Sequence, residues 1–454
     1  MGRCFGFRQR FYPDFRAAQL RGGHGGHGFL PPARERHKER RAPAPAGCLG
    51  WRQMSPRPSP VEIFLVALRL GCTSFGGPVA HLAFFRQEYV EKRRWLDEAH
   101  YADLVALCQF LPGPASSQTG FGIGYLQRGL AGGLAAWLGF TLPSAILMIG
   151  FAYGITSLGN LEAAGWLKGL KAAAVAVVAQ AVWAMWRNLC PDRPRSLLAG
   201  VSAGVLLMVP QGWSQVAVIA TGTAIGWGFL RAGPPLAGGP TQQTQPGSTT
   251  SADPTSGIIC LFLFFVLLLV LPLLAHATAN PALEIFDRFY RAGSLVFGGG
   301  HVVLPLLERE VVAPGWVTHD QFLAGYGAVQ AVPGPLFTLS AYLGAVASHG
   351  PGNWLGGVWA LIAIFLPALL LVAGALPFWQ VLRYRPAAQA ALRGANAAVV
   401  GVLLAALYHP VGTAGITDVR TLGLAVAALI ALQLARIPVW GVVIAAAAIG
   451  AWWW

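Results

Sequence analysis

Charged residues are scarce in this sequence. They make up 11% of its 454 residues, while hydrophobic residues make up 55% and the mean hydropathy is +0.54. A soluble domain carries about 25% charged residues. The deficit excludes an ordinary soluble globular protein and indicates a polytopic membrane protein.

Cysteine is also infrequent, and its spacing points to no metal or disulfide chemistry. The six cysteines form no CxxC or other ligand pattern, so neither a disulfide framework nor a metal site is predicted. Paired thiols, a cofactor fingerprint and a histidine ligand set are missing, which argues against a membrane-embedded enzyme. We therefore expect no cofactor and no enzymatic activity.

The strand-period alternation of membrane barrels is absent, and long apolar runs take its place. A crossing needs about 20 residues, so a run can form one span or a hairpin of two short spans. The strong runs are 131–157, 167–186, 196–230, 258–279, 355–378, 388–407 and 420–454, and the weaker ones are 61–82, 103–125, 283–307 and 322–347. The sequence predicts an all-α membrane protein with about 10–12 apolar segments. Asp97 and Thr318, which follow Trp95 and Trp316, are expected to cap helices.

Much of the net charge of +14 is concentrated near the N-terminus. Residues 1–58 hold twelve basic and three acidic side chains. Their composition predicts a disordered segment, and they contain no apolar stretch that resembles a signal sequence. The charge therefore indicates no nucleic-acid partner. This leader is a cytoplasmic basic tail, a contact with the lipid surface or, as we favour, an over-long start before Met54. The first half would follow at 59–231, then a flexible linker at 232–257 and a second half at 258–454.

One set of residues occurs twice in the same order. The first copy comprises Arg69, Phe75, Gly76, Gly77, Glu88, Gln109 and Pro112-Gly113-Pro114. The second comprises Arg291, Phe297, Gly298, Gly299, Glu310, Gln330 and Pro333-Gly334-Pro335. The copies are offset by 221 or 222 residues, so the chain has two homologous halves. Matched Gly- and Pro-broken segments in two apolar halves indicate the central binding site of a transporter.

Each Pro-Gly-Pro motif should break a helix, because proline lacks the backbone donor and clashes with the preceding turn. The helix that restarts behind it would present free N–H groups, hydroxyls and the positive end of its dipole, which suits an anion. The alternative is that these are packing glycines and kink prolines of an ordinary bundle. The predicted substrate-binding residues are Arg69, Gly76, Gly77, Ser116, Ser117, Arg291, Gly298, Gly299 and Thr338.

The repeated charged residues allow more than one interpretation. Arg69 and Arg291 lie in apolar helices, where an arginine costs about 2.5 to 3.5 kcal/mol, so each should bind a partner or line a wet cavity. The alternative is that they snorkel from a helix end to the interface. Glu88 and Glu310 are either structural partners of neighbouring arginines or proton-carrying carboxylates of a coupled antiporter.

Charge around the two copies differs, which bears on orientation. The first helix of the first copy is followed by the basic residues Arg86, Lys92, Arg93 and Arg94, whereas Arg309 of the second copy is flanked by Glu308 and Glu310. The positive-inside rule makes the first loop cytoplasmic and favours oppositely oriented halves. The basic residues Arg187, Arg193 and Arg195 fit this scheme poorly.

Taken together, these motifs resemble the chromate ion transporter family in its long, two-domain form. They are FGGP at 75–78, RxEYV at 86–90, FLPGP at 110–114, FGGGH at 297–301 and QAVPGP at 330–335, and the likeness spans about residues 60–454. The resemblance implies a multi-pass protein of the cytoplasmic membrane that exports chromate and confers resistance to it. It also supports Met54 as the start. Two features depart from the family pattern, namely Gly300 where the first copy has Pro78, and the basic leader.

The expected mechanism places the chromate dianion between the two broken helices, with access alternating as the halves rock. Export would be driven by membrane potential, proton antiport or both. The expected partners are chromate, with sulfate as a related oxyanion, the lipid bilayer, and a second copy in a homodimer. The alternatives are uptake or exchange of sulfate or a similar oxyanion, the membrane-embedded enzyme considered above, and a non-transporting scaffold.

Overall fold

The computed structural model describes residues 58–157, 164–209, 214–230, 254–297, 300–379 and 385–454. Regular structure within these ranges is entirely helical, and five helices are long and apolar enough to cross a membrane. The predicted all-α class is therefore confirmed. The leader and most of the predicted linker lie outside the described residues, and the helix α8 already begins at Pro254.

The described residues of the first half form seven α-helices and one π-helix. They are α1 (Pro60–Thr73), α2 (Gly77–Phe85), η1 (Arg86–Lys92), α3 (Glu98–Phe110), α4 (Ala115–Ser157), α5 (Gly165–Leu189), α6 (Arg193–Met208) and α7 (Ser214–Phe229). The apolar run at 196–230 is thus a hairpin of two short helices.

The long helix α8 (Pro254–Thr278) precedes the second copy of the repeat, and no equivalent helix precedes α1 among the described residues of the first half. The second half contains α9 (Pro281–Ser294), η2 (Gly300–Val302), α10 (Val303–Val311), α11 (His319–Ala331), η3 (Leu336–Thr338), α12 (Leu339–Val346), α13 (Asn353–Ala375), η4 (Leu376–Phe378), α15 (Pro386–Ala406), η5 (Leu407–Gly412), α16 (Thr413–Gly415), α17 (Val419–Gln433) and α18 (Val439–Trp453). The run at 420–454 is again a hairpin.

Local sequence signals set several of these boundaries. Both Pro-Gly-Pro motifs interrupt the helical structure, so the predicted helix breaks are confirmed. The side chain of Asp97 accepts a hydrogen bond from the backbone of His100 and caps α3. Thr318 caps α11 in a capping box with Gln321. Both predicted caps are therefore confirmed, since a short polar side chain replaces the missing backbone acceptors of the first turn.

The segments around the helix breaks are re-entrant. Helix α4 reverses at Arg128 and Gly129, where the backbone leaves the helical region. Three contacts hold the ends of these segments together at one side of the molecule. Arg93 pairs with Glu62 at 2.9 Å, the Gln127 side chain donates to the carbonyl of Trp95 at 2.7 Å, and the Arg128 side chain donates to the carbonyl of Pro58 at 2.9 Å. Thus α1 with α2, and α3 with the first limb of α4, each enter the protein and return.

The two halves have opposite orientations. The second limb of α4 and the equivalent helix α13 run antiparallel, because residue numbers rise along one as they fall along the other. Trp137 packs on Phe365 with 5.7 Å between ring centroids, and the Tyr153 hydroxyl accepts a hydrogen bond from the backbone of Trp354 at 3.2 Å. Both helices are candidate spans, so the duplication is an inverted repeat.

The re-entrant segments also resolve the orientation of the basic loops. Because α1 and α3 each return to their starting side, the chain passes through the second limb of α4 and through α5 before reaching Arg187 and Arg193. These arginines therefore lie on the same side as Arg86 and Arg93. The stretch that fitted the positive-inside rule poorly in the sequence agrees with it in the structure, and the rule predicts that this side is cytoplasmic.

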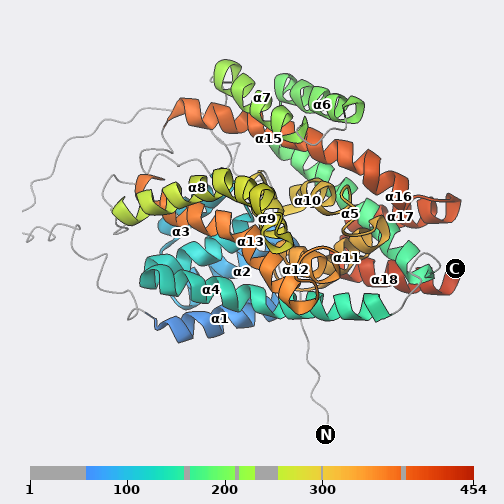
Figure 1. Cartoon of the computed structure of the whole chain (residues 1–454), viewed down its shortest axis with the longest axis horizontal. Coiled ribbons are helices and arrows are strands. Elements are labelled where there is room, and N and C mark those ends of the chain that lie inside the picture. The colour runs from blue at the N-terminus through green and yellow to red at the C-terminus, as the bar shows by residue number, and fades with distance from the viewer. Residues whose placement is uncertain (1–57, 158–163, 210–213, 231–253, 298–299, 380–384) are drawn as a thin grey trace, which may run out of the picture. The chain divides into compact units, whose positions relative to one another are not determined.

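The halves exchange helices. Helix α5 of the first half packs against α17 and α18 of the second, while α15 of the second packs against α6 and α7 of the first, as Figure 1 shows for the α15 contact. Glycines allow the close approach. A Cβ on Gly169 would meet the backbone of Ala446, and one on Gly394 would meet the backbone of Gly222. Neither sequence half is therefore a self-contained packing unit.

Candidate functional site

The two Pro-Gly-Pro loops meet the broken helices of the opposite half. The Gly113 N–H donates to the carbonyl of Val296 at 2.7 Å, and the Gly334 N–H donates to the carbonyl of Ser74 at 3.1 Å. Val296 and Ser74 occupy equivalent positions, just before the repeated Phe-Gly-Gly. This reciprocal pair of hydrogen bonds brings four chain breaks together around an approximate two-fold axis.

Glycine is required at the centre of both loops. Gly113 and Gly334 have φ angles of 126° and 105°, in the region that L side chains rarely adopt. A Cβ on Gly113 would lie 2.8 Å from the Cβ of Ala368, and one on Gly334 would lie 2.7 Å from the Ser144 hydroxyl oxygen. Each loop therefore packs on the long helix of the other half, α13 or α4.

A buried histidine connects the first broken helix to the restarted one. His81 of α2 is 1% exposed, with Nε2 at 3.2 Å from the carbonyl of Ser74 and Nδ1 at 3.4 Å from the Ser116 hydroxyl. Because a carbonyl can only accept, Nε2 carries the proton, and in the neutral ring Nδ1 accepts from Ser116. The ring also packs edge-on against Phe140.

Several buried donors near this histidine have no protein partner among the described residues. They are the hydroxyls of Ser74, Ser117 and Thr141 and the indole N–H of Trp137. A buried polar group without a hydrogen bond costs about 1 to 3 kcal/mol, so native proteins rarely leave one unexplained. Hydroxyl and indole donors of this kind are suited to a ligand rich in acceptor oxygens.

The polar character belongs to the first half. Six polar positions of the first half have apolar counterparts in the second, as the pairs Ser74/Val296, His81/Val303, Ser116/Phe337, Gln118/Leu339, Thr141/Phe365 and Ser144/Ala368 show. All six polar residues are buried. The two halves share the helix breaks, but the first has more buried polar side chains around its break, which marks it as the candidate binding half.

The helices that restart after the two breaks also differ, and the first again has more free hydrogen-bond donors. The first N–H groups of α4 precede any intrahelical acceptor, and they lie beside the unpartnered Ser117 hydroxyl. In the second half the Thr338 hydroxyl donates to the carbonyl of Pro335 at 2.8 Å, and the chain restarts as a 3-10 turn. The start of α4 therefore offers the better anion site.

The two repeated arginines do not share an environment. Arg69 is exposed on α1 and forms no ion pair among the described residues. Arg291 pairs with Asp287 at 2.9 Å and approaches Glu310 at 3.6 Å. The Asp287 side chain is 5% exposed, so the charge of Arg291 is largely neutralised within the protein. The structure does not bring the two guanidiniums together.

The repeated glutamates also differ, and both lie outside the five long apolar helices. Burial favours a higher pKa for Glu88, but hydrogen bonds from Arg93 and Lys92 outweigh it, so the pKa is lowered. Burial raises the pKa of Glu310, and burial raises the pKa of the neighbouring Glu308 to about 7. Glu88 is therefore held as a charged structural partner, whereas the second-half pair is suited to taking up a proton.

Of the two repeated glycine pairs, the structure describes only the first. Gly76 and Gly77 have φ angles of 104° and 78° at the start of α2, and a Cβ on Gly77 would meet nothing within 4 Å. Gly298 and Gly299 lie outside the described residues. Sequence reasoning overlooked His81, Thr141 and Trp137. A position-by-position comparison of the halves for polar residues facing apolar ones would have indicated the first two.

Comparison with known proteins places these features in a family. A family model described as "Chromate transporter" matches residues 61–227 and 283–451, one match in each half. A "Probable chromate transport protein" of Synechococcus elongatus is 26% identical over 80% of this chain and 87% of its own length. A "Chromate transport protein" of Pseudomonas aeruginosa is 28% identical over 68% of this chain and 70% of its own.

A third relative, the "Chromate transport protein" of Cupriavidus metallidurans, is 25% identical over 76% of this chain and 81% of its own length. No solved structure matches the chain. The family matches and the long apolar helices together identify a multi-pass membrane protein.

Proposed function

Because this chain belongs to the chromate transporter family, we propose that it carries chromate across the membrane through a site in its first half. The observation that carries this proposal is the group of unpartnered buried donors beside the start of α4, namely Ser74, Ser117, Thr141 and Trp137. Hydroxyl, indole and backbone N–H donors are suited to the oxygens of a tetrahedral oxyanion. The names of the relatives supply chromate as the anion.

Sulfate is the alternative substrate. Chromate and sulfate share tetrahedral shape and charge, and a site of this kind separates such isosteres poorly. The exposed guanidinium of Arg69, five residues before Ser74, would attract either anion toward the break. Arg291 would contribute less, because Asp287 neutralises it.

Export from the cytoplasm is the proposed direction, and the cytoplasmic membrane is the proposed location. With the interior negative, moving a dianion outward is favourable by roughly 4.6 kcal/mol per 100 mV. That corresponds to a concentration ratio of about 10³ without a coupling ion. Membrane potential alone could therefore support efflux and chromate resistance.

Proton antiport would add to this drive through the second half. Glu308 and Glu310 lie in the last turn of α10, at the end of the re-entrant pair α9 and α10, which the inverted repeat turns toward the outer side. Their raised pKa values favour proton uptake from that side. Glu88, paired with Lys92 and Arg93, is not proposed as a carrier. Of the two repeated glutamates, only Glu310 is therefore proposed as a proton carrier.

Alternating access would involve moving units drawn from both halves. Since α5 packs against α17 and α18, and α15 against α6 and α7, a rocking body must contain helices of both sequence halves. The helices around the breaks, including α4 and α13, would form one body and the exchanged helices the other. The reciprocal bonds of Gly113 and Gly334 lie within the first body.

Chromate flux into inverted membrane vesicles tests the proposal. Uptake into the vesicle lumen is expected to increase with a lumen-positive potential and to be reduced by sulfate. An absence of chromate movement under every imposed gradient would refute the substrate, and movement of sulfate alone would establish the alternative.

A matched pair of hydroxyl variants tests the site. Ser117→Ala should raise the KM for chromate about tenfold or more, because a hydrogen bond to a charged group is worth about 1.5 to 3 kcal/mol. Thr338→Ala, at the equivalent position, should leave the KM unchanged, because its hydroxyl is already bonded to Pro335. Equal effects in the two variants would contradict a first-half site.

A further inference from the structure

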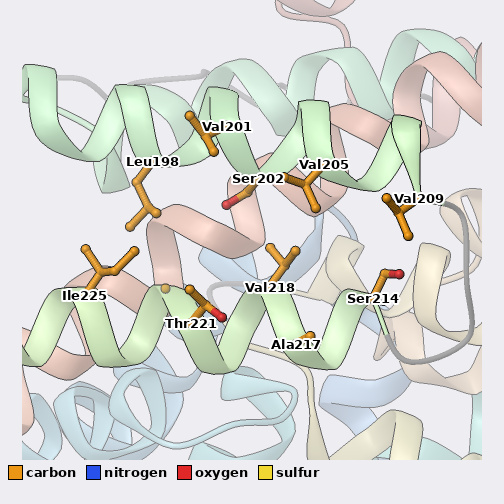
Figure 2. Close-up of a pocket in the computed structure, with 11 residues that line it drawn as sticks. Leu198, Val201, Ser202, Val205, Val209, Ser214, Ala217, Val218, Thr221 and Ile225 are labelled. Carbon is orange, nitrogen blue, oxygen red and sulfur yellow. The ribbon is translucent and has the colours of Figure 1, made fainter.

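A groove runs between α6 and α7. Figure 2 shows side chains of the two helices facing each other across it, from Leu198 and Ile225 at one end to Val209 and Ser214 at the other. Its volume is about 240 Å³. The walls are mostly aliphatic, and Val201 and Val205 are exposed along it. The two helices therefore do not pack tightly against each other, and the apolar groove between them stays open.

Basic residues gather at the Leu198 end of this groove. Arg187 ends α5, Arg193 begins α6 and Arg385 precedes α15, and all three are exposed without an ion pair among the described residues. Arg195 is paired with Asp192 at 2.6 Å, and the Arg393 side chain donates to the carbonyl of Leu230 at 2.8 Å. The last contact ties the start of α15 to the end of α7, so the termini of four helices meet there.

The charge at this end is incompletely balanced. Asp192 forms its ion pair with Arg195. Among the described residues, the exposed guanidiniums of Arg187, Arg193 and Arg385 therefore pair with no carboxylate. Arg193 lies five residues before Leu198, or about 7.5 Å along the helix. An anionic group bound at Arg193 would thus sit one and a half turns from the mouth of the apolar groove.

We propose that this groove and its arginine end bind one anionic phospholipid of the cytoplasmic leaflet, with an acyl chain between α6 and α7 and the phosphate at Arg193. The apolar groove matches the chain, and the unpaired guanidiniums match the headgroup charge. The end lies on the side that the positive-inside rule predicts to be cytoplasmic, where anionic lipids attract basic residues at about 1 kcal/mol each. This site is separate from the central donors and does not rest on the proposed substrate.

The inverted repeat supplies an internal control. Helices α17 and α18 are the equivalents of α6 and α7, and α17 begins with Asp418 as its cap and Arg420 exposed in its first turn. Because the repeat is inverted, Arg420 lies at the opposite membrane side. A variant there removes an exposed arginine of equivalent position without touching the proposed site.

The test compares lipids added to the purified full-length chain in detergent. Native mass spectrometry should show one tightly retained phosphatidylglycerol and at least tenfold weaker retention of phosphatidylcholine. The double variant Arg193→Gln/Arg385→Gln should lose this preference, and Arg420→Gln should keep it. Equal retention of both lipids by the unmodified chain would overturn the proposal, as would an unchanged preference in the double variant.

Two further measurements distinguish the contribution of the apolar groove to lipid binding from that of the arginines. Ala217→Phe places a ring in the groove and should weaken phosphatidylglycerol retention about tenfold while the melting temperature of the lipid-free protein stays within about 2 °C. Free glycerol 3-phosphate should not compete at concentrations where phosphatidylglycerol does. Effective competition by glycerol 3-phosphate would mean a phosphate site without an acyl chain and would overturn the proposal.

Discussion

Arg69 and Arg291 hold equivalent positions in the repeat but have different surroundings. Asp287 occurs at a position where the first half has Leu65, and this single difference places a buried carboxylate beside Arg291. An ion pair formed within one half can stabilise that half without contacting the substrate. A repeated residue therefore need not have a repeated role.

Removal of Arg291 tests this interpretation. Arg291→Ala should destabilise the protein by about 1 to 3 kcal/mol, because Asp287 would remain buried without its partner. This destabilisation is smaller than the one expected for a fully buried ion pair, because the Arg291 side chain is 36% exposed. Adding Asp287→Leu, the residue of the first half, should restore the melting temperature in detergent. If the double variant stays as unstable as Arg291→Ala, the stranded carboxylate is not the cause.

The glutamate with a raised pKa gives a pH dependence of defined sign. Burial raises the pKa of Glu308 from 4.5 to about 7, so the folded protein binds this proton more tightly than the unfolded chain. Stability from this group is present at low pH and is lost as pH rises through about 7. The melting temperature should therefore fall between pH 5 and pH 8, and the fall should be smaller in Glu308→Gln.

A control for this experiment lies close by. His319 is 3.6 Å from Glu308, and burial lowers its pKa from 6.5. It gains charge only on acidification, so His319→Gln should leave most of the decrease between pH 7 and pH 8 unchanged. An equal slope in the unmodified protein and in Glu308→Gln would show that Glu308 does not titrate in this range.

Among the elements, the interrupted helices are the most constrained. Gly113 and Gly334 combine positive φ with close contacts to the opposite half, so each break is fixed by both backbone conformation and packing. Helix α4 illustrates the result, since its start is held at the centre while its second limb crosses beside α13. The breaks position uncapped N–H groups at the two-fold axis, where an uninterrupted helix would have none.

Alanine at these glycines should be strongly destabilising. Gly113→Ala and Gly334→Ala should each cost at least about 1 to 3 kcal/mol from backbone strain, with the contact to Ala368 or Ser144 adding to it. Gly204→Ala on α6 is the control, because a Cβ there meets nothing within 4 Å. Folded yield and melting temperature by fluorescence-detected size exclusion would measure both. Normal stability in either loop variant would contradict the assigned constraint.

At the scale of the whole molecule, the exchange of helices makes the halves interdependent. The apolar faces of α5 are covered by α17 and α18, and those of α15 by α6 and α7. A half made alone would expose these faces and lack the two reciprocal glycine bonds. Folding of one half should therefore require the other.

Splitting the chain between Pro240 and Thr241 tests this dependence, since the cut falls outside the described helices. The two fragments, starting at Met54 and Thr241, should copurify through a tag on the first when they are expressed together. Each fragment alone should be degraded or aggregated, as judged by membrane yield and size exclusion. A stable, monodisperse single half would show that the exchange is dispensable.

The sequence by itself determined the class, the duplication, the breaks and the caps. Each follows from local chemistry: an apolar run is apolar in any fold, proline lacks its N–H everywhere, and Asp97 or Thr318 caps the helix that follows it. The family resemblance rested on the same short motifs, and the family matches over 61–227 and 283–451 confirm it.

Only the tertiary structure decided which residues of these motifs act together. These contacts join positions that are far apart in the sequence, in one case by more than 200 residues. They are the contacts of Gly113 with Val296, of His81 with Ser74 and Ser116, and of α5 with α18. Burial depends on what covers a side chain, which no local pattern contains. For that reason the sequence located two equivalent helix breaks, while packing decided that the Ser117 hydroxyl is buried without a partner and that the equivalent Thr338 hydroxyl is bonded to Pro335.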